Sequence, residues 1–209
     1  MMSTSDLRDT CQLLGGLALD GARVDLLREI QRDGTAARLG TSLGDELGVA
    51  LSAMQHALDE EELESLAVEF TRLLIASGAR KPVPVPPWED CYVGKGRVVQ
   101  GDRSRAALLA YATARFAFDG ITEQPADHMG LELCFVAALL DEERSGERDG
   151  TARAAFVEEH LKTFSPAFGR TLSEAAGKSF WREAGKAIAM LPAALSGPVS
   201  PTEVSPSDT

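Results

Sequence analysis

The chain has 209 residues, of which 44% are hydrophobic and 25% are charged, a composition typical of a folded protein and too apolar for general disorder. Acidic residues outnumber basic ones by 32 to 21, which gives a net charge of −11. This charge repels nucleic-acid phosphates and anionic lipids and attracts cationic peptides. We therefore expect no nucleic-acid partner and no stable membrane insertion.

The cysteines and the N-terminus indicate the compartment. Cys11, Cys91 and Cys134 are far apart, odd in number and without CxxC spacing, so they predict neither a disulfide framework nor a thiolate zinc site. The first nine residues lack the apolar core of a signal peptide, and no run approaches the roughly 18 apolar residues of a membrane span. These features predict a cytoplasmic protein.

Apolar residues recur at three- and four-residue steps along almost the whole chain, whereas alternating runs rich in Val, Ile and Thr are nearly absent. This pattern predicts an all-α fold. Gly15, Gly16 and Gly34 weaken or separate the first helices, and Asp59, three residues before Glu62, is the expected N-cap of a later one. The N-terminal stripes lie at residues 7–18, 24–30, 43–58 and 63–74.

A long connection is predicted at about residues 78–102. It contains the sequence Lys-Pro-Val-Pro-Val-Pro-Pro-Trp at 81–88, in which the prolines remove backbone donors and forbid helix. Connections of this length inside a compact domain are usually functional or mobile. This segment is therefore a candidate binding element.

The second half again shows helical periodicity and ends in a polar tail. We expect one globular bundle of about eight to ten helices over residues 1–195. Residues 196–209 lack apolar periodicity and are expected to be disordered. Helices are predicted at about 105–118, 129–140 and 149–164, with a stop before Ser165-Pro166 and further helix to about Leu195.

The segment Glu123-Gln124-Pro125-Ala126-Asp127-His128, followed by an apolar helix, resembles the E-x-P-x-D-H signature of the TorD/DmsD family of redox-enzyme maturation chaperones, which is related to NarJ. Residues 69–74 and 86–92 resemble its E-Y-x-R-L-F and P-P-x-E-S-x-Y elements. Residues 156–164 are similar to its F-x-x-x-H-x-x-x-W element, with Phe164 in place of Trp. Asp90-Cys91 replaces the common Ser-Val, and a basic insert follows Tyr92.

This resemblance implies a TorD-like fold and a chaperone that catalyses no reaction. Such a chaperone binds the twin-arginine leader of a DMSO-reductase-type molybdenum enzyme and assists cofactor insertion and assembly before Tat export. The implied partners are that leader and the catalytic subunit of a molybdopterin oxidoreductase. The family's leader-binding positions fall here on Pro87, Trp88, Pro125, Asp127 and His128.

The chemistry of a leader peptide adds Glu123 to these five residues. Two arginines before an apolar stretch need carboxylates beside an apolar, aromatic surface. Asp127, Glu123 and Trp88 can supply both, so we expect Asp127, His128 and Trp88 to surround one shared cavity with Glu123 nearby. No catalytic residue, metal ligand or cofactor is predicted.

Several other interpretations stay open at this point. Asp127 can simply complement a helix N-terminus, Trp88 can be a core anchor, and His160 is expected to be a hydrogen-bonded structural histidine. His128 and Glu132, four residues apart, can bind a metal. A helical carboxylate metalloprotein that uses His128, His160 and nearby acids is the alternative class. A NarJ-type nitrate reductase chaperone and a generic helical adaptor are further alternatives. The sequence is compatible with a monomer and with a helix-swapped dimer.

Overall fold

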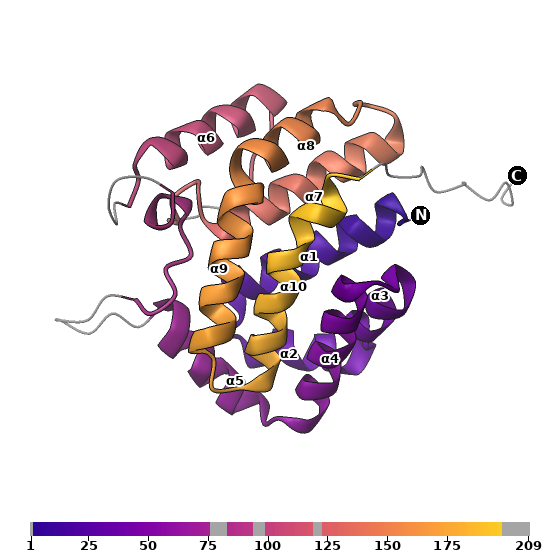
Figure 1. Ribbon diagram of the computed structural model, residues 1–209, viewed down its shortest axis with the longest axis vertical. Helices are drawn as coiled ribbons and strands as arrows, with labels where there is room; N and C mark the ends of the chain where they lie inside the picture. The colour runs from indigo at the N-terminus through magenta and orange to yellow at the C-terminus, as the bar shows by residue number, and fades with distance from the viewer. Residues whose placement is uncertain (1, 76–82, 94–98, 119–122, 198–209) are drawn as a thin grey trace, which may run out of the picture.

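The computed structural model describes residues 2–75, 83–93, 99–118 and 123–197 of the chain (Figure 1). These parts are almost entirely helical and contain no β-strand, which confirms the all-α prediction. The helices are α1 (Thr4–Asp20), α2 (Val24–Asp33), α3 (Thr35–Leu43), α4 (Glu46–Glu60), α5 (Leu63–Phe70), α6 (Asp102–Ala114), α7 (Met129–Ser145), α8 (Thr151–Phe156), α9 (Lys162–Ala175) and α10 (Ser179–Leu195), with π-helical turns η1 (Thr71–Ile75) and η3 (Val157–Leu161) and a 3₁₀ turn η2 (Glu89–Cys91).

The helices pack in pairs around a continuous apolar core to which all of α1–α10 contribute. The helices α9 and α10 run side by side through the centre of the molecule, and α6, α7 and α8 lie across one end of them (Figure 1). The helix α1 packs along α7, α3 packs along α4, and α4 also contacts α10. None of the described helices is long and apolar enough to cross a membrane.

Glycines allow two of these helix pairs to approach closely. A Cβ atom added at Gly130 of α7 would lie 2.8 Å from the carbonyl oxygen of Gly15 in α1. A Cβ atom at Gly185 of α10 would lie 2.6 Å from the carbonyl oxygen of Gly169 in α9. Since real side chains do not approach a backbone so closely, these positions bring the two backbones into direct contact. The pairing of α1 with α7 places the end of α1 beside the start of α7, where the candidate site lies.

Several predicted helix boundaries were wrong, and among them the helix expected to end at Phe118 ends at Ala114 in α6. Asp59 is not an N-cap but lies inside α4, where its carboxylate accepts a hydrogen bond from Gln55 Nε2 at 3.0 Å, and Glu62 is the N-cap of α5. The helix expected to stop before Ser165-Pro166 continues through Pro166, which lies inside α9. Phe164 and Phe168 anchor both sides of this proline in the core, so packing outweighs the lost hydrogen bond. The predicted tail lies outside the described residues from 198 onward, as do parts of the predicted 78–102 connection.

Candidate functional site

Two of the segments that resemble family motifs, residues 86–92 and 123–128, meet at an isolated antiparallel bridge between Trp88 and His128. The Glu89 N–H donates to the Asp127 carbonyl oxygen at 2.9 Å, and the Met129 N–H donates to the Pro87 carbonyl oxygen at 2.7 Å. Trp88 and His128 both have extended backbones, as expected for a proline-rich segment and for a residue that precedes a helix. In such a pairing, opposed residues lie on the same side and their chain neighbours point to the other side.

His128 directly precedes α7, at the helix start that the sequence predicted for this segment. Its Nδ1 accepts a hydrogen bond from the Gly130 N–H at 3.1 Å, so the imidazole acts as the N-cap of the helix. Burial lowers the pKa of His128 to about 4. The ring is therefore neutral near pH 7, in agreement with its role as a hydrogen-bond acceptor.

On the side of the bridge that carries Trp88 and His128, the surface opens into a pocket of about 140 Å³. Trp88 is half-buried, and its Nε1–H is buried without a hydrogen-bond partner among the described residues. The pocket lining is mostly apolar, and Trp88, which carries this unsatisfied donor, forms part of it. It is lined by Ala18, Leu19, Phe70, Leu74, Ile75, Pro87, Trp88, Gln124 and His128.

Asp127 points to the other side of the bridge and does not line this pocket, contrary to the expectation that it shares a cavity with Trp88 and His128. Its side chain is fully buried, and Oδ2 accepts the Asp90 N–H at 3.0 Å. Burial raises the pKa of this carboxyl, and the hydrogen bond from Asp90 opposes the shift. The described contacts of Asp127 thus join the two motif segments.

Asp90 extends this buried connection to α6. Its carboxylate accepts the backbone N–H groups of Gly101 at 2.6 Å, Arg103 at 3.1 Å and Ser104 at 3.2 Å. Because these groups lie at the start of α6 and have no partner within that helix, Asp90 caps it from a distant position in the sequence. This explains why α6 begins at Asp102 rather than at the expected Arg105.

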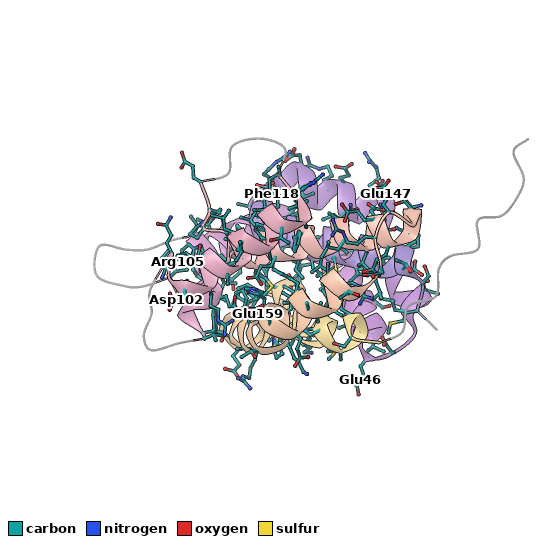
Figure 2. The ribbon with its side chains drawn as sticks, turned by 90° about the horizontal axis from the view of Figure 1, so that it is seen from above. Glu46, Asp102, Arg105, Phe118, Glu147 and Glu159 are labelled. Atoms are coloured by element: carbon teal, nitrogen blue, oxygen red, sulfur yellow. The ribbon has the colours of Figure 1, made fainter. Side chains whose placement is uncertain are left out.

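The other two predicted site residues, Glu123 and Pro125, flank the pocket residue Gln124 in the sequence but do not line the pocket themselves. Glu123 is exposed. Pro125 lines a second pocket of about 390 Å³, and Gln124 lines both. The second pocket extends along α6 to Arg105, which lies with Asp102 at the outer edge of the molecule in Figure 2. The structure therefore brings Pro87, Trp88 and His128 together, places Pro125 in the neighbouring pocket and Asp127 in the interior, and leaves Glu123 exposed outside both pocket linings.

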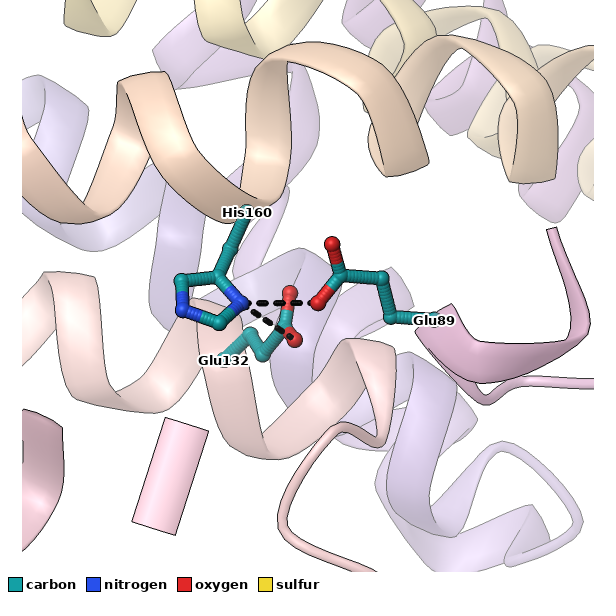
Figure 3. Close-up of side chains that lie close together, drawn as sticks. All are labelled: Glu89, Glu132 and His160. Carbon is teal, nitrogen blue, oxygen red and sulfur yellow. Dashed lines mark hydrogen bonds and ion pairs between the residues drawn. The ribbon is translucent and has the colours of Figure 1, made fainter. Parts of the chain in front are cut away.

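Behind the bridge, Glu89, Glu132 and His160 form a buried cluster (Figure 3). His160 Nδ1 lies 2.7 Å from Glu89 Oε2 and 3.9 Å from Glu132 Oε1. The expectation of a hydrogen-bonded histidine at His160 is confirmed, with the ring 1% exposed. Burial, and secondarily the nearby charges of Glu89 and Asp127, raise the pKa of Glu132 well above its usual value.

The sequence interpretation did not identify this cluster as such. It paired Glu132 with His128 and named His160 with His128 and nearby acids, but His128 caps its own helix and lines the pocket, whereas Glu132 faces His160. Glu89 was not singled out at all. The available signal was that all three residues lie in or directly after the resembling motif segments, although their spacing along the chain does not show that they meet.

Comparisons with known proteins agree with this architecture. Residues 41–170 match the family model of the nitrate reductase delta subunit, a range that includes all of the motif segments. The chain belongs to this family. The nitrate reductase delta subunit family includes NarJ- and TorD-type chaperones, so the resemblance inferred from the motifs is confirmed.

A solved structure described as a redox enzyme maturation protein from Archaeoglobus fulgidus shares the fold. The two chains are 22% identical with a TM-score of 0.55, over 87% of this chain and 91% of the other. No match to a curated protein was found. The family match indicates a redox-enzyme maturation chaperone, and the solved structure shows the same fold.

Proposed function

We propose that this chain is a cytoplasmic chaperone that binds the twin-arginine leader of a DMSO-reductase-type molybdenum enzyme and assists cofactor insertion and assembly before export. It acts by binding its client and catalyses no reaction. The observation that supports this best is the pocket at the Trp88–His128 bridge, where two separate motif segments form an apolar surface that includes Trp88, whose indole donor is unsatisfied.

The apolar part of the leader is proposed to occupy this pocket. Phe70, Leu74 and Pro87 give the apolar contact area, and the neutral ring of His128 adds to it without a charge. If the Trp88 ring turns toward the ligand, its buried Nε1–H can donate to a backbone carbonyl of an extended peptide. Since an unsatisfied buried donor costs about 1–3 kcal/mol, a ligand that accepts this hydrogen bond is favoured over an apolar molecule of the same size.

The arginine pair is proposed to contact carboxylates beside the pocket. Glu123 is exposed close to the pocket residue Gln124, and Asp20 is exposed at the end of α1, directly after the pocket residue Leu19. Guanidinium groups pair well with carboxylates, and the net charge of −11 favours the approach of a cationic peptide. Pro125 and Asp127 are proposed to hold the segment that carries Glu123 and His128 in place, with Asp127 acting through Asp90.

Titration calorimetry of the full chain with synthetic leaders tests this proposal. The leaders are those of DMSO-reductase-type enzymes encoded in the same genome, each with an Arg-Arg to Ala-Ala variant. We expect at least one authentic leader to bind and its Ala-Ala variant to bind about tenfold more weakly, which corresponds to about 1.4 kcal/mol. Absence of binding by all authentic leaders contradicts the proposal.

Variants of the chain test whether the leader binds at the pocket. Trp88→Ala is expected to weaken leader binding, whereas Val49→Ala, at an apolar residue of α4 that is 68% exposed, is expected to leave it unchanged. If the Trp88→Ala chain binds the leader as tightly as wild type, the leader does not bind at this pocket.

A nitrate reductase chaperone is the second candidate, because the matching family is that of the nitrate reductase delta subunit. The same titration with the N-terminal peptide of a nitrate reductase catalytic subunit distinguishes the two clients. Tighter binding of that peptide than of any twin-arginine leader would favour this second function and keep the same pocket.

A further inference from the structure

The cluster of Glu89, Glu132 and His160 brings three potential ligands together from three separate elements. Glu89 lies in η2, Glu132 in the first turns of α7 and His160 in the π-helical turn η3. One carboxylate oxygen from each glutamate and one imidazole nitrogen lie within 4.8 Å of one another, and all three side chains are buried. Figure 3 shows the two carboxylates pointing toward Nδ1 of the imidazole.

Glu132 is the part of this cluster that the protein leaves unsatisfied. Its side chain is 0% exposed, and neither carboxylate oxygen has a hydrogen-bond partner among the described residues. The guanidinium of Arg103 approaches Glu89 Oε1, at 3.7 Å from Nε, and that oxygen is itself without a hydrogen bond. A buried, unpaired carboxylate is strongly unfavourable, so such a group takes up a proton or has a cation or hydrogen-bond donor directed at it.

We propose that Glu89, Glu132 and His160 bind one divalent transition-metal ion. Ligand atoms bound to one such ion lie about 2.0–2.2 Å from it and therefore up to about 4.4 Å from one another. The distance of 3.9 Å between His160 Nδ1 and Glu132 Oε1 lies within this range. The distance of 2.7 Å between His160 Nδ1 and Glu89 Oε2 needs to open by only a few tenths of an ångström.

The donor set indicates which ions fit. One imidazole nitrogen with two carboxylate oxygens suits zinc, iron or manganese, whereas magnesium prefers oxygen ligands and retains several waters. A divalent ion neutralises the two carboxylates and contacts both Glu89 and Glu132. The ring of His160 stacks on Phe156 with a centroid distance of 4.5 Å, which fixes its orientation toward the carboxylates.

An ion at this position would connect η2, α7 and η3 from inside the molecule. Its role is structural, because the site lies behind the bridge and the three side chains are no more than 1% exposed. The proposal is independent of leader binding, since the pocket residues Trp88 and His128 are not among the ligands. Either proposal can therefore fail without affecting the other.

The test uses the purified full chain, stripped of metal with EDTA and then titrated separately with Zn²⁺, Mn²⁺ and Mg²⁺ by calorimetry and with Co²⁺ by visible absorption. We expect one transition-metal ion per chain, with Zn²⁺ tighter than Mn²⁺ and Mg²⁺ weakest. Zn²⁺ is also expected to raise the thermal unfolding midpoint, because it binds only the folded chain.

The variants Glu132→Gln and His160→Gln are expected to weaken Zn²⁺ binding by at least about tenfold and to abolish the thermal shift. The control is His56→Gln, because His56 lies outside the cluster and forms an exposed pair with Glu60 at 4.0 Å. This substitution is expected to leave Zn²⁺ binding unchanged. Circular dichroism confirms that each variant is folded, and Glu89→Gln replaces any variant that is not. A folded wild-type chain that binds no ion, or folded ligand variants that bind Zn²⁺ as well as wild type, would overturn the proposal.

Discussion

The two sides of the Trp88–His128 bridge are built from neighbouring residues but have opposite properties. Trp88 and His128 face an open pocket, whereas Glu89 and Asp127, each one residue away, face the interior. The pocket side has a neutral imidazole and an unsatisfied indole donor. The interior side has carboxylates that hold other segments in place or lie close to His160.

This difference shows that a short motif can carry two kinds of residue. Because successive residues of an extended chain point to opposite sides, one segment can present a surface to a ligand and also fix its own position in the fold. Substitutions on the interior side are therefore expected to lower stability, and substitutions on the pocket side to change binding.

The largest effect is expected for Asp90→Ala. This change leaves three backbone N–H groups at the start of α6 without their acceptor. We expect the free energy of unfolding to fall by about 3 kcal/mol in urea denaturation. Asp102→Ala, at a side chain that is 94% exposed in the same helix turn, is the control and should change stability by less than about 0.5 kcal/mol. If both variants lose the same free energy of unfolding, Asp90 does not cap α6.

Asp127→Ala is expected to lower the free energy of unfolding by about 2 kcal/mol, because it removes the buried acceptor of the Asp90 N–H. Glu123→Ala, four residues earlier and exposed, should leave stability unchanged and weaken only the binding of an arginine-containing leader. Urea denaturation and calorimetry on both variants separate the two roles. A stable Asp127→Ala chain with lost leader binding would show that Asp127 contacts the leader directly.

His128 is expected to make stability dependent on pH. Its folded pKa of about 4 lies below the unfolded value of 6.5, so the stability that it contributes is present above pH 6.5 and is lost as the pH falls toward 4. His128→Asn keeps a helix-capping oxygen and does not titrate. Between pH 7.5 and 5.5, wild type should lose about 1 kcal/mol more than this variant in urea denaturation. Parallel pH profiles would contradict a neutral, buried His128.

Trp88→Phe is expected to give the smallest change in stability, less than about 0.5 kcal/mol, because the aromatic contact area is largely retained. The lost Nε1–H donor should weaken leader binding about fivefold, which corresponds to one neutral hydrogen bond of about 1 kcal/mol. Calorimetry and thermal unfolding measure the two effects. A large loss of stability with unchanged binding would identify Trp88 as a core anchor.

The sequence by itself determined the fold class, the family and the segments that form the site. Helical periodicity predicted the all-α fold because a repeat of three and four residues places apolar side chains on one helix face, whatever the tertiary structure. The proline-rich stretch predicted a non-helical segment for an equally local reason. The motif Glu123–His128 indicated both the family and the start of α7, since His128 caps that helix within two residues.

Only the tertiary structure decided which way each motif residue points. The bridge between Trp88 and His128 joins segments that are 40 positions apart, and it assigns Trp88 to the pocket and Asp127 to the interior. The same holds for Glu89 and His160, whose side chains meet across 71 positions. Local patterns cannot predict these contacts, because they depend on how distant helices pack and on the side to which an extended residue turns.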